Sequence, residues 1–183
     1  MQRLVVLAVL AALGAPAHAD VGASILVHAS SYGGLQEGGG GVMMEVSRRR
    51  GRLEYFGDVG ISVVSGKRGT EALGTGVDTN LLGGVRVIAR SFAADEAAIE
   101  LAIDLFAGVQ HMRWSEEHVT RPQFGAGLGW QVRLREKKTI RIMTRLFAAP
   151  TFGDRDEPVC RGACPEQPRE TAYGFMGLMG ASW

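Results

Sequence analysis

The sequence predicts an all-β protein: a single antiparallel up-and-down transmembrane β-barrel of about eight strands. Three observations support this fold class. Apolar and polar residues alternate along most of the chain, which is the period of a β-strand. Strong helix signals are absent beyond the N-terminal segment, and the strand-like runs are joined by connections that alternate in length. The chain has 183 residues and a formal net charge of +1, so we expect one domain and no nucleic-acid partner.

Residues 1–19 predict a secretory signal peptide. Arg3 provides a positive start, residues 4–14 form an apolar run, and Ala-His-Ala before Asp20 is a small-residue cleavage pattern. The apolar run is shorter than the roughly 20 residues of a membrane-spanning helix, which disfavours the alternative of an uncleaved anchor. We therefore expect residues 20–183 to form an exported barrel domain.

Eight runs of the mature chain have the character of strands. They are residues 21–30, 41–47, 53–64, 81–91, 98–112, 124–134, 140–149 and 172–183. The fifth run alternates most cleanly, since Ile99, Leu101 and Ile103 fall on one face and Glu100 and Asp104 on the other. The stretch FGAGLGWQVRLR, residues 124–135, covers the sixth run; one of its faces is wholly apolar and the other changes from glycine to arginine along the strand.

The connections predict which kind of barrel this is. Those after odd-numbered runs are long (residues 31–40, 65–80, 113–123 and 150–171), and those after even-numbered runs are short (residues 48–52, 92–97 and 135–139). Outer-membrane barrels have tight periplasmic turns and longer external loops. A soluble meander has no reason to place every long connection at one end.

The polar face of the runs predicts a charged lumen. Glycine and glutamine alternate there with isolated Arg, Asp and Glu, a composition suited to paired charges in a narrow interior. If the turn after the fourth run is centred near Asp95, antiparallel pairing places Arg90 opposite Glu100 and Arg86 opposite Asp104. The predicted lumen charge network comprises Asp58, Arg86, Arg90, Glu100, Asp104, Arg133 and Arg141.

The final residues, YGFMGLMGASW, alternate and stop on an aromatic residue. With the leader ending APAHA and runs such as FGAGLGWQVRLR, the chain resembles the small bacterial outer-membrane barrels of the OmpA-like and OmpX-like group. That resemblance implies an outer-membrane location and lipid contact. It also implies recognition by the barrel assembly machinery through the last strand. The implied assembly signal consists of Tyr173, Phe175, Met179, Ala181 and Trp183, with Trp183 where the group usually carries Phe.

Two cysteines, Cys160 and Cys164, lie in the polar segment EPVCRGACPEQP. Exported chains meet oxidising conditions, so this pair predicts a small disulfide loop. A metal site is the alternative, but two sulfurs without a nearby histidine make a poor ligand set.

Signals for catalysis are weak. His28-Ala-Ser30 faintly matches the His-x-Ser pair of outer-membrane lipid A deacylases, and His118 lies beside two glutamates. Gly125, Gly127 and Gly129 imitate a phosphate-binding loop, but no helix is predicted after them. We therefore expect no catalytic residue, cofactor or metal.

The expected function is a non-enzymatic outer-membrane barrel with a structural or surface-interaction role through its external loops. An interior only wide enough for side chains disfavours a large aqueous pore. Two alternatives remain open at this stage: a secreted soluble β-barrel binding a small apolar ligand, and an outer-membrane lipid-modifying enzyme. The surface partner is not identified by the sequence.

Overall fold

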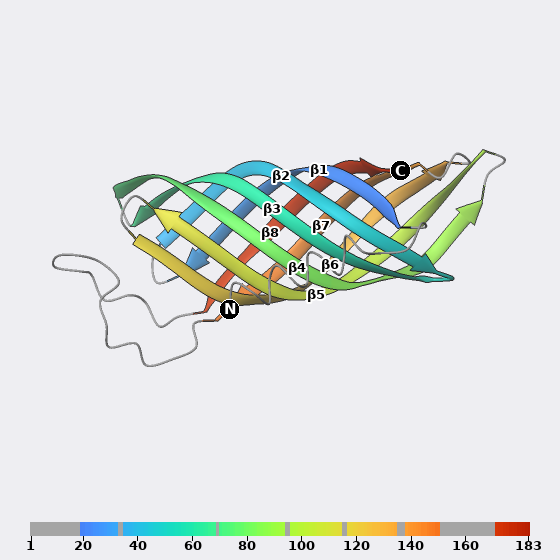
Figure 1. Cartoon of the computed structure of the whole chain (residues 1–183). Helices are drawn as coiled ribbons and strands as arrows, with labels where there is room; N and C mark the ends of the chain where they lie inside the picture. The colour runs from blue at the N-terminus through green and yellow to red at the C-terminus, as the bar shows by residue number, and fades with distance from the viewer. Residues whose placement is uncertain are drawn as a thin grey trace.

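The computed structural model describes residues 19–32, 35–68, 70–93, 96–114, 117–134, 138–150 and 171–183. Eight antiparallel strands follow one another around a closed barrel, because the last strand pairs with the first (Figure 1). They are β1 (Asp20–Tyr32), β2 (Leu35–Arg50), β3 (Leu53–Arg68), β4 (Glu71–Ala93), β5 (Ala97–Trp114), β6 (Glu117–Leu134), β7 (Thr139–Ala149) and β8 (Ala172–Ser182). The predicted all-β up-and-down barrel is confirmed.

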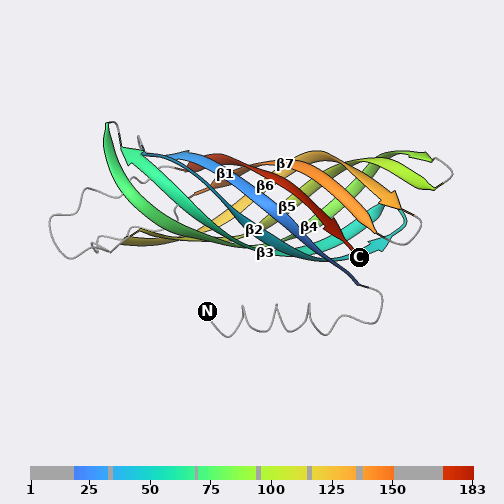
Figure 2. The same cartoon turned by 90° about the horizontal axis from the view of Figure 1, so that it is seen from above.

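The barrel has two distinct ends. The turn end carries the β2–β3, β4–β5 and β6–β7 connections together with Asp20 and Trp183, and the loop end carries the other four connections. The β4–β5 hairpin extends past the neighbouring strands at the turn end, as two perpendicular views agree (Figures 1 and 2). Within the described ranges, no helix is long and apolar enough to cross a membrane.

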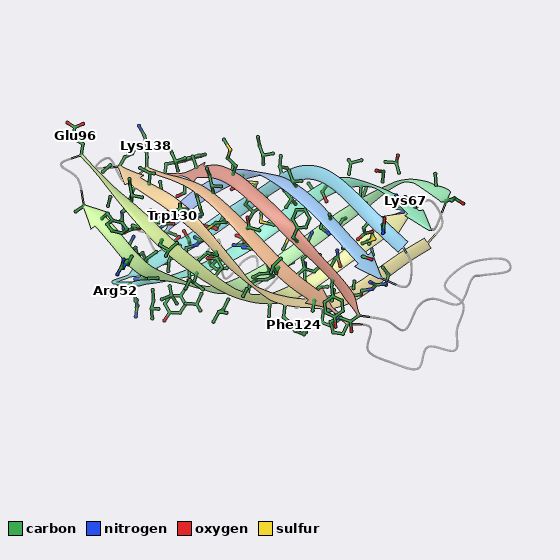
Figure 3. The ribbon with its side chains drawn as sticks, turned by 180° about the vertical axis from the view of Figure 1, so that it is seen from behind. Arg52, Lys67, Glu96, Phe124, Trp130 and Lys138 are labelled. Carbon is green, nitrogen blue, oxygen red and sulfur yellow. The ribbon has the colours of Figure 1, made fainter. Side chains whose placement is uncertain are left out.

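Strand periodicity separates the two faces of the barrel wall. In β7 the side chains alternate between buried and outward-facing along the whole strand. In β6 the apolar positions Phe124, Leu128 and Trp130 point outward and are 50–56% exposed. Figure 3 labels Phe124 and Trp130. The interior therefore holds the polar face, together with a minority of apolar residues such as Met43, Phe56 and Phe106.

Three of the four long connections expected from the sequence are wrong, because the chain continues as strand through most of each. Only two residues separate β1 from β2, two separate β3 from β4, and two separate β5 from β6. The extension of β2 toward its N-terminus could not be predicted from the glycine run at residues 38–41, because glycines show no alternation of apolar and polar side chains. A Cβ at Gly41 would lie 1.9 Å from the carbonyl oxygen of Ile61, so glycine permits this close approach of β2 to β3. Residues 151–170 of the fourth connection lie outside the described residues.

Candidate functional site

Arg86 of β4 occupies the centre of the lumen and has an exposed fraction of 0%. Its Nε and Nη2 donate to the two oxygens of Asp104 over 2.7 and 3.2 Å. Its Nη1 donates to Glu54 over 2.7 Å and to Glu45 over 3.2 Å, and its Nη2 also donates to Glu45 over 2.9 Å. These five contacts equal the five N–H donors of a guanidinium, so Arg86 is fully coordinated by three carboxylates.

Arg145 of β7 lies beside Arg86 and is also 0% exposed. Its Nη1 donates to Asp58 over 2.6 Å. Its Nε and Nη2 donate to Asp104 Oδ2 over 2.9 and 2.7 Å. Asp104 therefore bridges the two arginines, one from the adjacent strand and one from two strands away.

Arg141 of β7 completes this charged centre. It donates to Glu45 and, over 2.9 Å, to Glu54, while its Nε donates to Gln131 over 3.1 Å. The central plug thus joins three guanidiniums and four carboxylates: Arg86, Arg141, Arg145, Glu45, Glu54, Asp58 and Asp104. Dense pairing of this kind is what buried charges require, because an isolated charge in the interior is strongly destabilising.

Aromatic rings cover the flat faces of the guanidiniums. The Cζ atoms of Arg86 and Arg145 lie 4.9 and 4.7 Å from the centroid of the Phe56 ring. The Cζ of Arg145 also lies 5.3 Å from the Phe106 centroid. Carboxylates at the edges and rings on the faces hold the arginines in fixed orientations.

A second ion pair lies toward the turn end. Arg49 donates two parallel bonds, of 2.7 and 2.8 Å, to Glu100, and Gln131 Nε2 donates to the same carboxylate over 2.8 Å. Arg49 is the middle member of three consecutive arginines, and strand alternation turns it inward.

A polar cluster lies toward the loop end. Asp78 Oδ2 accepts from Asn80 over 2.9 Å and from Gln110 over 3.3 Å, and His28 Nδ1 lies 3.4 Å from the same oxygen. The His28 ring is tilted against Phe147, with centroids 5.5 Å apart. Nearby, Ser30 donates to Glu37. Charge pairing is sparser here than in the central plug.

This cluster does not form a lipid-facing catalytic site. His28 and Ser30 are both buried and point into the lumen, where Ser30 bonds Glu37 and His28 approaches Asp78. Among the residues the structure describes, no group of three or more His, Cys, Asp or Glu is arranged to hold a metal ion. Gly127, which the sequence placed in a glycine-rich stretch, lies within β6.

One predicted pairing is wrong. Arg86 does lie opposite Asp104, but Arg90 lies opposite Leu101, and Ser91 rather than Arg90 faces Glu100. The cause is an irregularity between Ile88 and Arg90 that shifts the register by one residue. The shift turns Arg90 to the outside, where it is exposed.

The remaining predicted lumen residues divide between the two ion-pair groups. Asp58 lies in the central plug but bonds Arg145 rather than Arg86. Arg141 bonds Glu45 and Glu54 rather than Asp104.

Arg133 is half-buried at the turn end, where it lies opposite Ala98 and Thr139, whereas Asp104 lies opposite Gly127.

Four charged participants were missed: Arg49, Glu45, Glu54 and Arg145. Strand alternation could have placed two of them in the lumen. Glu54 alternates with the outward Leu53 and Tyr55, and Arg145 shares the face of Arg141. Their partners were not readable, because most of these contacts cross the lumen between strands that are not neighbours.

The final strand closes the barrel. Trp183 exchanges two backbone hydrogen bonds of 3.0 Å with Val21 of β1. The predicted assembly-signal residues all point outward: Tyr173, Phe175, Met179, Ala181 and Trp183. Their role in assembly stays a prediction. Cys160, Cys164 and residues 1–18 of the predicted signal peptide lie outside the described residues.

No protein-family model matches the chain, and no characterised protein matches it in sequence. Among solved structures, the chain is similar to Neisserial surface protein A, with 10% identity, 90% of this chain and 94% of that chain covered, and a TM-score of 0.57. It is also similar to Ail, the attachment invasion locus protein of Yersinia pestis, in complex with the heparin analogue sucrose octasulfate, with 7% identity, 90% and 95% coverage, and a TM-score of 0.49. The N-terminal β-barrel domain of Pseudomonas aeruginosa OprF matches with 11% identity, 87% and 96% coverage, and a TM-score of 0.35. The first similarity, the one with a TM-score above 0.5, shows that the two proteins share a fold.

Proposed function

We propose that this chain is a small integral β-barrel protein of the bacterial outer membrane, non-enzymatic, with a structural or surface-interaction role through its loop end. The observation that carries this proposal is the inverted distribution of side chains. Ion pairs and other polar side chains outnumber the apolar ones inside, and aliphatic residues cover the outside. A protein dissolved in water gains stability from the opposite arrangement.

The apolar outer band supports membrane contact. Large outward residues recur on every strand, including Ile25, Met44, Ile61, Leu105 and Leu146, and Leu146 is 66% exposed. Isolated exposed aliphatics are ordinary on soluble proteins, but a band around the whole circumference matches the apolar belt of membrane barrels.

Strand length and closure also support the proposal. A tilted strand needs about 9–11 residues to cross the bilayer core, and the shortest strands here, β7 and β8, each have 11. Closure through β1 and β8 leaves no unpaired edge in the barrel wall, as lipid requires. Strands β2 to β6 are longer, so they extend beyond the apolar band.

The central plug argues against a pore role. Arg86, Arg145, Phe56 and Phe106 meet across the middle of the lumen, and eight strands enclose little more than side chains. The surface available for interaction is therefore the two ends and the lipid-facing wall.

The two alternatives receive less support. A soluble carrier of an apolar ligand needs an apolar interior, and this interior holds paired charges. A lipid-modifying enzyme needs catalytic groups that reach the lipid, and His28 and Ser30 point inward.

Fractionation with heat-modifiability tests the proposal. We expect the mature chain to remain in the outer-membrane pellet after buffer and high-salt washes and to require detergent for release. Unheated protein should migrate differently from boiled protein on a denaturing gel, because a closed barrel resists unfolding. Release with buffer alone would contradict membrane insertion. Altered lipid A in cells expressing the chain would favour the enzyme.

A further inference from the structure

We propose that the outer wall at the turn end carries a binding site for anionic phospholipid headgroups, formed by the exposed arginines Arg48, Arg50, Arg52 and Arg90 (the arginine belt). This inference rests on the proposed membrane function and names a lipid class for one leaflet. The belt spans the end of β2, the β2–β3 turn and β4, with β3 between the last two. Figure 3 shows Arg52 at the turn end of the barrel.

Strand alternation creates the belt from a run of consecutive charges. Arg49 turns inward to Glu100, so its neighbours Arg48 and Arg50 must turn outward. The register shift in β4 turns Arg90 outward as well. Two independent features of the backbone therefore place arginines on the same side of the barrel.

Charge on this side of the wall is unbalanced. Every acidic side chain of β2, β3 and β4 whose burial is described is buried in the lumen: Glu37, Glu45, Glu54, Asp58 and Asp78. The belt arginines are exposed, and no hydrogen bond or ion pair to a described acidic residue is seen for them. Glu96 is also exposed at the turn end (Figure 3), so the four arginines leave an excess of positive charge there, which an external anion would balance.

The position of the belt selects a lipid headgroup as that anion. Arg48 lies opposite Tyr55, and Arg90 lies opposite Leu101, which in turn lies opposite Trp130. Tyr55 and Trp130 point outward and are about half exposed, and such aromatics concentrate where headgroups meet acyl chains. Towards the loop end, the outward positions of β2 and β3 become apolar, as at Met44 and Val59.

The chemistry suits a phosphate. A guanidinium offers paired N–H donors to phosphate oxygens, and its long apolar stem can lie along lipid while the head reaches the interface. Leu53 and Tyr55, which lie on β3 between the arginines of β2 and β4, offer an apolar surface to the acyl chain below the headgroup. The site thus matches an anionic phospholipid rather than a free ion.

The test uses the full-length mature chain in nanodiscs of phosphatidylcholine with and without phosphatidylglycerol. Native mass spectrometry counts the phosphatidylglycerol molecules retained. Each basic residue near an anionic surface strengthens binding by about fivefold, so Arg90→Gln should weaken retention by that factor. The triple variant Arg48→Gln/Arg50→Gln/Arg90→Gln should weaken it on the order of a hundredfold, because the three factors multiply.

A control replaces two exposed basic residues at the other end of the wall, Lys67→Gln with Arg113→Gln, and the losses are compared per charge removed. This control should retain phosphatidylglycerol as the unchanged chain does, and the Arg→Lys triple variant should recover most of the loss. Equal retention by the triple variant and the control would overturn the lipid site. Binding of soluble anionic glycan with no lipid preference would overturn it too.

The outcomes separate this inference from the proposed function. A chain that does not enter phosphatidylcholine nanodiscs at all contradicts the membrane function itself. A chain that enters them, remains heat-modifiable and shows no preference for phosphatidylglycerol contradicts only the lipid site. If the triple variant loses heat-modifiability, the single Arg90→Gln variant decides the question.

Discussion

Arg86 and Asp104 form a two-pronged ion pair at the centre of the lumen, with Nε–Oδ1 and Nη2–Oδ2 distances of 2.7 and 3.2 Å. Both side chains are 0% exposed. The pair connects the two halves of the central plug, since Arg86 also bonds Glu45 and Glu54 and Asp104 also bonds Arg145. The barrel is therefore held across its axis by charge as well as around its wall by backbone hydrogen bonds.

Breaking this pair should destabilise the barrel strongly. We expect Arg86→Ala and Asp104→Ala each to lower the free energy of unfolding by about 3–5 kcal/mol, because each strands a buried partner. The double variant should cost less than the sum, as measured by urea unfolding in a bilayer. Arg113→Ala, at an exposed position near the loop end of β5, is the control, with an expected change of at most about 1 kcal/mol. Simple additivity in the double-mutant cycle would contradict the coupling.

Gly127 makes room for the plug and should not tolerate a side chain. A Cβ there would lie 2.7 Å from Cγ of Arg145 and 3.4 Å from Cβ of Asp104. Gly127→Ala should therefore displace Arg145 and destabilise the barrel by about 1–3 kcal/mol.

The control for Gly127 is Gly83→Ala, whose nearest neighbour is the Phe56 carbonyl oxygen at 3.9 Å. Thermal unfolding measures both variants. A Gly127→Ala barrel as stable as the Gly83→Ala barrel would show that Arg145 moves freely.

A charge in the middle of the outer band distinguishes a membrane barrel from a soluble one. Leu105 points outward and is 53% exposed. If lipid surrounds it, Leu105→Arg should cost about 2–4 kcal/mol in a bilayer, and Thr75→Arg, near the loop end, about 0–1 kcal/mol. A neutral or stabilising effect of Leu105→Arg would indicate that this surface faces water.

Removing Trp183 should impair assembly. Its backbone exchanges two hydrogen bonds with Val21, and its side chain is 64% exposed on the outside of the barrel. We expect the truncated chain to give a reduced yield of heat-modifiable protein in the membrane and Trp183→Phe to keep a normal yield. Normal yield from the truncated chain would show that the last residue is not part of an assembly signal.

The predicted Cys160–Cys164 disulfide lies outside the described residues and stays a prediction. Mass spectrometry of protein from its native compartment should find the two thiols oxidised. Closing so short a loop removes little chain entropy, so Cys160→Ser with Cys164→Ser should leave the unfolding midpoint of the barrel unchanged. Two free thiols in the native compartment would refute the bond.

Local periodicity was sufficient to predict the barrel wall. A period of two assigns each residue to a face without knowledge of its neighbours, so the outward Leu128 and the inward Asp104 follow from sequence alone. The Arg86–Asp104 register is also local, because a short turn joins the two strands and a slip of one residue would turn both charges outward.

The register at Arg90 was not predictable in this way. The irregularity after Ile88 shifts the pairing without a signature in the alternation. The extension of the strands beyond their expected ends was not predictable either. Backbone hydrogen bonds pair the glycine run of β2 with β3, and these bonds do not depend on the side chains.

The central plug was decided by barrel closure. Glu45 meets Arg141 although they are 96 residues apart and lie on strands β2 and β7, which do not pair with each other. The alternation of the sequence determined which face most of the charges take, with Arg90 as the exception. Only the closed barrel, by bringing opposite walls within reach of one guanidinium, decided which of those charges bind each other.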